Sequence, residues 1–133
     1  MVSLKGRVSL AEKGYWVIEL PAVAAITQGT SREDAFLMLE DYLECHLEEK
    51  PAYNISDDGG KDFTINFSVD SNLLPWVLKQ LRQSNGLSHN QAAEKLGLKS
   101  NNAYRRYEEG RSTPTVSKLH DLLSITGHKL VIE

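Results

Sequence analysis

The spacing of apolar residues changes near residue 72, and this change limits what the chain can fold into. Before it, apolar and polar residues alternate over residues 2–10 and 63–70, as in strands with one buried face. After it, apolar residues recur three and four positions apart, as on one side of a helix: Leu74, Val77, Leu78 and Leu81. The expected fold class is α+β, with a small sheet over residues 1–70 and a helical domain over 71–133.

Three strands are expected first. The strand over residues 2–10 has an inner side made of Val2, Leu4, Val8 and Leu10. Residues 15–20 are rich in aromatic and β-branched side chains and predict a second strand, which Pro21 ends because proline cannot donate to a ladder. Residues 24–27 predict a short third strand.

An acidic helix is expected next. Ser31 and Asp34 have the spacing of a capping box, and helical periodicity then continues to about residue 49. Its predicted inner face consists of Ala35, Leu39, Tyr42, His46 and Leu47. Another face carries a ridge of carboxylates, namely Glu40, Glu44 and Glu48 beside Asp41.

Residues 51–62 contain Asp57-Asp58-Gly59-Gly60 and predict a loop before the last strand. The expected order in this half is therefore β-β-β-α-β. The single cysteine, Cys45, cannot form an internal disulfide and is expected to be a buried or half-buried small residue.

Turn and capping residues predict four helices in the C-terminal half. Pro75 opens the first helix and Asn85-Gly86 closes it. Ser88 caps the second helix, with Gln91 completing a capping box, and Gly97 supplies the next turn.

The third of these helices, opened by Ser100 or Asn101, carries residue types suited to DNA. Tyr104 and Tyr107 are expected to contact the core, while Asn101, Asn102, Arg105 and Arg106 point outward. Arginine can bond guanine bidentately, asparagine can bond adenine, and both can hold phosphates. A short helix with both residue types suits a major groove.

A fourth helix, capped by Thr115 and ended by Gly127, is followed by a predicted strand. That strand comprises Lys129, Leu130, Val131 and Ile132. It is the expected seam of a homodimer or a higher oligomer such as a tetramer. Two copies are needed because one helix-turn-helix reads a half-site and the two lie about 34 Å apart on the duplex.

Four motifs closely resemble the phage-repressor (Cro/C1, Xre-type) helix-turn-helix: Gly86-Leu87-Ser88, Ala93-Glu94-Lys95-Leu96-Gly97, Tyr107-Glu108-Glu109-Gly110 and Pro114. The resemblance implies that the second and third helices meet the duplex. The expected DNA-binding residues are Ser88, His89, Gln91, Lys99, Ser100, Asn101, Asn102, Arg105, Arg106 and Arg111. His89 stands where the family usually has a phosphate-binding glutamine. The open alternative is a four-helix module used only for protein contacts.

Charge is divided between the two halves. Residues 1–72 hold 6 Lys or Arg against 13 Asp or Glu, a net charge of -7, whereas the remainder holds 9 against 5, a net charge of +4. This division favours two partners of opposite charge. The modest positive charge predicts weak, salt-dependent DNA binding by a single copy.

The N-terminal half carries four short motifs: Gly14-Tyr15-Trp16-Val17, Leu20-Pro21, Thr27-Gln28-Gly29-Thr30 and Glu33-Asp34-Ala35. Together they resemble the HicB antitoxins of bacterial toxin–antitoxin operons. The resemblance implies a degraded RNase H-like sheet in a protein that silences a small basic HicA-type ribonuclease toxin. It also implies repression of the operon that encodes both proteins.

The acidic ridge has two interpretations. It can be a solvated helix face, or it can dock the toxin, with expected toxin-binding residues Tyr15, Glu19, Glu40, Asp41, Glu44 and Glu48. Like charges four residues apart cost a helix a few tenths of a kcal/mol per pair, so the ridge does not arise from helix stability.

No catalytic, metal or cofactor site is expected. Only Glu19, Glu40, Asp62 and Asp70 are plausible carboxylates for a two-metal nuclease, and their spacing does not gather them. The absence of a long apolar run or a signal peptide predicts a cytoplasmic protein without a membrane span. The alternative function is a regulator whose N-terminal domain binds a small ligand or oligomerises, without a toxin.

Overall fold

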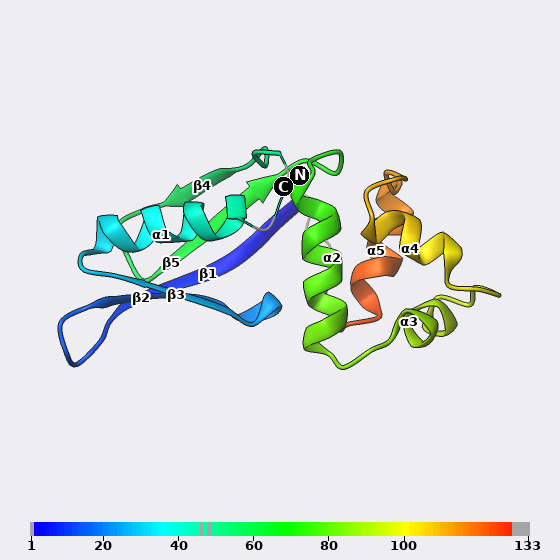
Figure 1. Ribbon diagram of the computed structural model, residues 1–133, viewed down its shortest axis with the longest axis horizontal. Coiled ribbons are helices and arrows are strands. Elements are labelled where there is room, and N and C mark those ends of the chain that lie inside the picture. Colours follow the sequence, from blue (N-terminus) through cyan, green and yellow to red (C-terminus); the bar gives the residue numbers. More distant parts are fainter. Residues whose placement is uncertain (1, 46, 48, 129–133) are drawn as a thin grey trace.

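The computed structural model describes residues 2–45, 47 and 49–128 (Figure 1). Its elements are β1 (Val2–Leu10), β2 (Trp16–Leu20), the 3-10 helix η1 (Pro21–Val23), β3 (Ala25–Gly29), α1 (Arg32–Cys45), β4 (Asn54–Asp57), β5 (Asp62–Phe67), α2 (Leu73–Ser84), α3 (His89–Lys95), α4 (Asn102–Glu108) and α5 (Val116–Ser124). The expected α+β class is confirmed. The strand predicted for Lys129, Leu130, Val131 and Ile132 lies outside the described residues.

The sheet has five antiparallel strands in the order β3-β2-β1-β5-β4. The predicted order β-β-β-α-β was therefore wrong in one respect, because β4 lies within the stretch expected to be a loop. Its residues pair with β5 from Asn54↔Asn66 to Asp57↔Phe63. Asn and Asp are uncommon in strands, and an edge strand has neighbours on one side only, so its sequence carries a weak signal.

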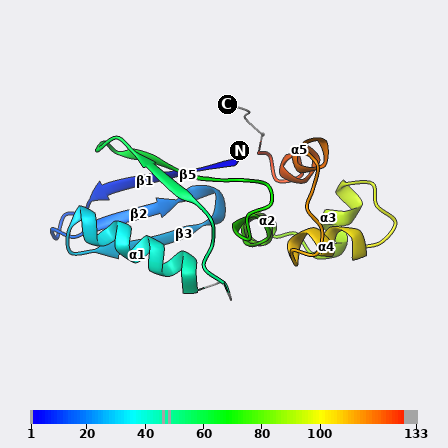
Figure 2. The same cartoon turned by 90° about the horizontal axis from the view of Figure 1, so that it is seen from above.

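One face of the sheet is apolar and lies against α1 (Figures 1 and 2). Val2, Leu4 and Val8 of β1 are buried as expected. Leu10 is 59% exposed, so its expected burial was wrong. It pairs with Trp16 at the end of the β1–β2 hairpin, which projects beyond α1 in Figure 1.

The opposite face is polar. Ser3 of β1 donates to Asn66 of β5 at 2.8 Å, and Asn66 donates to Asn54 and Ser56 of β4 at 3.0 and 2.9 Å. These side-chain amides and hydroxyls hydrogen-bond to one another on the face turned toward solvent, which is typical of an antiparallel sheet with one solvated face.

Helix α1 begins as predicted and ends earlier. The Asp34 amide donates to Ser31 Oγ at 3.0 Å, while the Asp34 carboxylate accepts from the Thr30 amide at 2.9 Å. The buried residues are Ala35, Leu39 and Leu43, and the predicted inner residues Tyr42 and Leu47 are only half-buried. His46 lies outside the described residues. Cys45 is exposed, contrary to expectation, because it lies four residues after Asp41 on the outer side.

Helix α2 stands at the end of the sheet, between the sheet and the helices α3, α4 and α5 (Figures 1 and 2). Trp76 packs edge-on against Tyr42 of α1, with ring centroids 6.1 Å apart. The buried apolar residues of both halves form one cluster, so the boundary at residue 70 stays a prediction. Within the described residues, every helix is too short or too polar to cross a bilayer.

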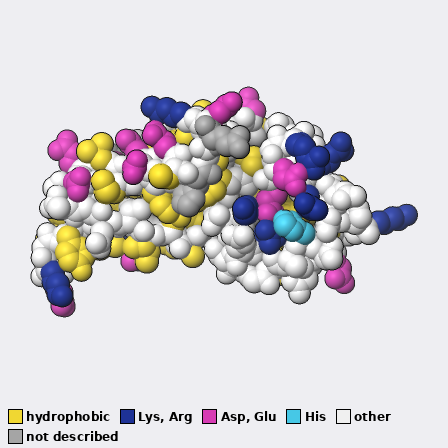
Figure 3. Space-filling view, in the orientation of Figure 1, with side chains coloured by type: hydrophobic (Ala, Val, Ile, Leu, Met, Phe, Trp, Pro, Cys, Tyr) yellow, Lys and Arg dark blue, Asp and Glu magenta, His cyan; other side chains and the backbone are white. Residues whose placement is uncertain are grey.

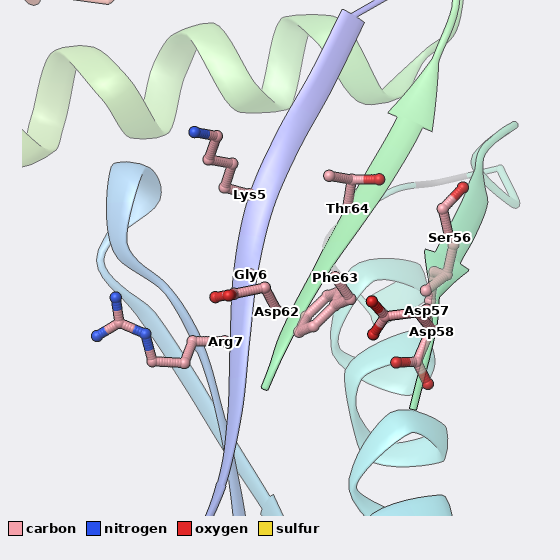
Figure 4. A pocket seen from close by; sticks show the side chains of 10 residues that line it. Lys5, Gly6, Arg7, Ser56, Asp57, Asp58, Asp62, Phe63 and Thr64 are labelled. Atoms are coloured by element: carbon pink, nitrogen blue, oxygen red, sulfur yellow. The ribbon is translucent and has the colours of Figure 1, made fainter. Parts of the chain in front are cut away.

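Gly6 of β1 packs closely against Phe63 of β5. The two residues are cross-strand partners, and a Cβ added to Gly6 would lie 2.1 Å from Cζ of Phe63. The Phe63 ring lies beside Gly6 in Figure 4, and the ring of Phe36 meets it edge-on with centroids 5.0 Å apart. An aromatic ring thus occupies the space that the glycine leaves, a device known to stabilise strand glycines.

We predict that Gly6→Ala lowers the free energy of unfolding by about 1–3 kcal/mol, because the added methyl displaces a packed ring. Thermal or urea unfolding measures the change. The exposed substitution Ser9→Ala on the same strand is the control and should change stability by less than about 0.5 kcal/mol. In a Phe63→Leu background the cost of Gly6→Ala should shrink, and an undiminished cost would show that the ring is not its source.

Candidate nucleic-acid interface

Helices α3 and α4 form the predicted pair, joined by a turn at Gly97. The Gly97 φ is +74°, in the left-handed region that glycine enters without strain, and the Leu98 amide donates to the Ala93 carbonyl at 2.9 Å. The capping box that opens α3 is confirmed. The Gln91 amide donates to Ser88 Oγ at 3.1 Å, and Ser88 N–H donates to Gln91 Oε1 at 2.8 Å.

Helix α4 has one buried side and one exposed side. Tyr104 and Glu108, four residues apart, are buried, and Tyr107 is half-buried. The exposed residues that share the other side through their three- and four-residue spacing are Asn102, Arg105, Arg106 and Glu109. The chemistry predicted to read DNA is therefore on the solvent side of α4.

Glu109 holds two arginines beside the end of α4. Its carboxylate lies 3.4 Å from Arg105 Nη2 and 2.6 Å from Arg111 Nη2. All three side chains are at least 42% exposed, so these pairs are weak and readily exchanged for contacts with phosphate. Arg105 and Arg111, from different segments, are thereby kept on one surface.

The other predicted DNA-binding residues divide into two groups. Lys99, Ser100, Asn102 and Arg106 are exposed. Ser88, His89, Gln91 and Asn101 also make contacts within the domain. Asn101 Nδ2 donates to Asn90 Oδ1 at 2.7 Å, which ties the start of α4 to α3, and the side-chain oxygen Oε1 of Gln91 accepts the capping-box hydrogen bond from Ser88 N–H.

Positive side chains gather over the helix-turn-helix, whereas acidic and apolar side chains gather over the sheet and α1 (Figure 3). The described cations outside the core of the C-terminal half are Lys79, Lys95, Lys99, Arg105, Arg106, Arg111 and Lys118. The exposed acids there are Glu94, Glu109 and Asp121. The surface around α3 and α4 is thus suited to a polyanion.

The residues expected to meet a toxin do not form one surface. Glu19 lies between buried Ile18 and Leu20, so strand alternation places it on the polar face of the sheet, with Tyr15 just before β2. Glu40, Asp41 and Glu44 are exposed on α1, which covers the opposite face. Glu48 lies outside the described residues.

A broad pocket of about 860 Å³ opens along β1, β5 and β4. Figure 4 shows Lys5 and Arg7 on one side of it and Asp57 and Asp58 on the other. Charges of opposite sign line it without converging on one point. Among the described residues, no group of His, Cys, Asp and Glu has the arrangement of a metal site.

The structure adds a buried ion pair that sequence reasoning missed. Arg82 of α2 donates to Glu108 of α4 through Nε at 2.9 Å and Nη2 at 2.8 Å, and through Nη1 to the Leu87 carbonyl at 2.8 Å. The two side chains are 9% and 4% exposed. The signal was present, because Arg82 lies four residues after Leu78 and so falls on the apolar face of its helix.

His89 and Tyr104 complete this cluster. His89 Nε2 lies 3.3 Å from Glu108 Oε1, and its ring is tilted against Tyr104 with centroids 6.3 Å apart. Burial, together with the neighbouring Glu108, raises the pKa of the Tyr104 phenol, so it stays neutral. The cluster therefore joins α2, the start of α3 and α4.

Burial alone would raise the pKa of Glu108, but hydrogen bonds from Arg82 and Tyr104 and the Arg82 charge outweigh it. The net effect is a pKa below the ordinary value of 4.5. A carboxyl group whose pKa falls on folding stabilises the protein fully above its ordinary value, and this contribution is lost as the pH falls through the folded value.

We predict that Glu108→Gln lowers the free energy of unfolding by about 3–5 kcal/mol near pH 7, because it leaves the Arg82 charge buried without a counter-ion. The neighbouring Glu109→Gln, which removes an exposed carboxylate, should cost less than about 1 kcal/mol. Denaturant unfolding across pH measures both.

The gap between the unsubstituted chain and Glu108→Gln should narrow as the pH falls below 4.5, because Glu108 of the unfolded chain then takes up a proton that the folded chain takes up only at a lower pH. Equal costs for the substitutions at 108 and 109, or a gap that widens in acid, would contradict this role of the pair.

Comparison with known proteins agrees with this geometry. A family model described as Helix-turn-helix matches residues 78–129, which include α3, the Gly97 turn, α4 and α5. No curated protein matches the chain. The C-terminal part of the chain is therefore a DNA-binding helix-turn-helix of the kind found in transcription regulators.

Proposed function

We propose that the chain is a HicB-type antitoxin, which binds and neutralises a small basic HicA-type ribonuclease and represses the operon encoding both. The observation that carries the proposal is the division of charge within one folded unit. The helix-turn-helix presents exposed arginines, while residues 1–72 hold a net charge of -7. The helix-turn-helix is thus suited to a polyanion such as DNA, and the acidic N-terminal half is suited to a basic protein.

For the DNA-binding half, we propose that α4 enters the major groove, with Asn102, Arg105 and Arg106 toward base edges and phosphates. Two copies would bind half-sites about 34 Å apart. The tail after residue 128 remains our candidate for the seam between them.

For the acidic half, charge narrows the class of partner. A surface of this sign repels nucleic acid and anionic membranes, and it attracts a protein that is itself basic. A ribonuclease must be basic where it grips RNA, and carboxylates placed there would compete with phosphates. The resemblance to HicB motifs points to the same kind of partner, and the RNase H-like origin of the sheet stays a prediction.

We predict that replacing Arg105 and Arg106 by Ala weakens binding to DNA from upstream of its own gene by about 30-fold or more, since each of the two lost contacts costs about 1–3 kcal/mol. Replacing Lys5 and Arg7 by Ala removes the same charge from the sheet and is the matched control. It should leave operator affinity within about threefold. Gel-shift titration at fixed salt measures both, and equal losses would mean that net charge, not α4, determines binding.

We predict that co-expression of this chain restores growth to cells producing the basic protein encoded beside it. The Arg105→Ala, Arg106→Ala variant should rescue equally well, because it leaves the acidic half intact. Colony counts on inducing plates measure the effect. Operator binding without any rescue would favour the alternative, a regulator whose N-terminal domain binds a ligand or oligomerises.

A further inference from the structure

We infer that the basic partner docks in the groove between α1 and the edge strand β4, with Leu37 as its apolar anchor. This inference rests on the proposed function and names the surface that carries it. Neither Leu37 nor β4 was singled out from the sequence.

The crest of α1 is an exposed stripe in which one leucine stands among three glutamates. Glu33, Leu37, Glu40 and Glu44 follow one another at four-, three- and four-residue intervals and so share one side of the helix. Leu37 is 57% exposed although its helix buries other apolar residues completely. An exposed apolar residue ringed by charge is a common centre of a protein interface.

Beside this stripe lies a groove of about 450 Å³ between α1 and β4. Its lining combines the half-buried Phe36 and Ile55, the exposed carboxylates of Glu33 and Glu40, and the paired side chains of Arg32 and Asp57. Arg32 donates two hydrogen bonds of 2.7 Å to Asp57 and so fastens α1 to β4. The groove is therefore part of the folded scaffold.

Tyr53, just before β4, lies where Glu40 and Glu44 make the electrostatic potential negative. Burial, followed by the negative charges of Glu40 and Glu44, raises the pKa of this phenol to about 12. The carboxylates thus make the formation of a further negative charge costly beside the groove. The same field favours a cation.

An exposed leucine beside a groove lined by aromatic, aliphatic and carboxylate groups fits one kind of occupant well. A lysine or arginine of a partner can lay its aliphatic stem on Leu37 while its charged end meets Glu40, much as the chain's own Arg32 lies over Phe36 with its Cζ 5.2 Å from the ring centroid. Nucleic acid and anionic lipid are repelled by the carboxylates. The polar face of the sheet is a weaker candidate, because its Ser3, Asn66 and Asn54 side chains bond to one another.

The test is titration calorimetry of the chain against the purified protein encoded beside it. One α1 variant removes the apolar anchor and another reverses a charge, and each has a matched control away from the groove. Leu37→Ala should weaken binding by about tenfold or more, as truncation of a central anchor does. Leu10 is 59% exposed at the far hairpin, so Leu10→Ala is the matched control and should change affinity by less than about twofold.

Glu40→Lys should also weaken binding by about tenfold or more, with a loss that shrinks as salt is raised, whereas Glu12→Lys in the β1–β2 turn should have a small effect. Thermal unfolding and operator binding confirm that each variant is folded. If Leu37→Ala alone is unstable, Glu40→Lys against Glu12→Lys decides.

The outcomes separate the inference from the proposed function. Unchanged affinity in both α1 variants, with tight binding by the unsubstituted chain, overturns the groove and leaves the antitoxin proposal standing. Failure of the unsubstituted chain to bind overturns both. If Leu37→Ala instead abolishes self-association seen by sedimentation while partner affinity holds, the occupant is a second copy and the inference is wrong.

Discussion

The burial of α2 on two sides is the constraint on which the rest of the structure depends. Of its 12 residues, 7 are buried, including the charged Arg82. Trp76 packs against Tyr42 of α1, and the same helix packs against η1 beside the sheet. From its other side Arg82 reaches Glu108 of α4. An ordinary surface helix has one apolar stripe, whereas α2 needs two partners to cover its surface.

Because α2 is shared, the surfaces on either side of it are held on one framework. Hydrogen bonds are directional and apolar contacts are not. The two bonds from Arg82 to Glu108 therefore fix how α4 lies against α2. His89 contacts the same carboxylate, which brings the start of α3 into the arrangement. The exposed side of α4 is therefore set by a polar cluster beneath it.

Features encoded by neighbouring residues were predictable from the sequence, and features that depend on distant contacts were not. The caps at Ser88 and Thr115 follow from spacings of three residues, and both are present. The Arg82–Glu108 pair joins residues 26 positions apart, and charged residues are ordinarily assigned to the surface. The strand β4 and the exposure of Leu10 were missed for the same reason, since each depends on where the sheet ends.

The candidate site shows the same division. Alternation and helical spacing predicted which residues of α4 point outward. They could not show that Glu19 of β2 and Glu40 of α1 lie on opposite sides of the sheet. Because of that arrangement and the exposure of Leu37, the candidate docking surface is the groove between α1 and β4, and not the acidic ridge alone.

The two charged surfaces can act independently despite sharing one small chain. At physiological salt the screening length is about 8 Å, and a helix with its side chains is about 10–12 Å across. Helix α2 stands between the sheet and α4 (Figure 1), so it alone separates them by more than one screening length. The acids of α1 therefore weaken the approach of DNA to α4 far less than the net charge of -3 suggests. In the proposed complex, the exposed cations around α4 would therefore attract the duplex with little opposition from these acids.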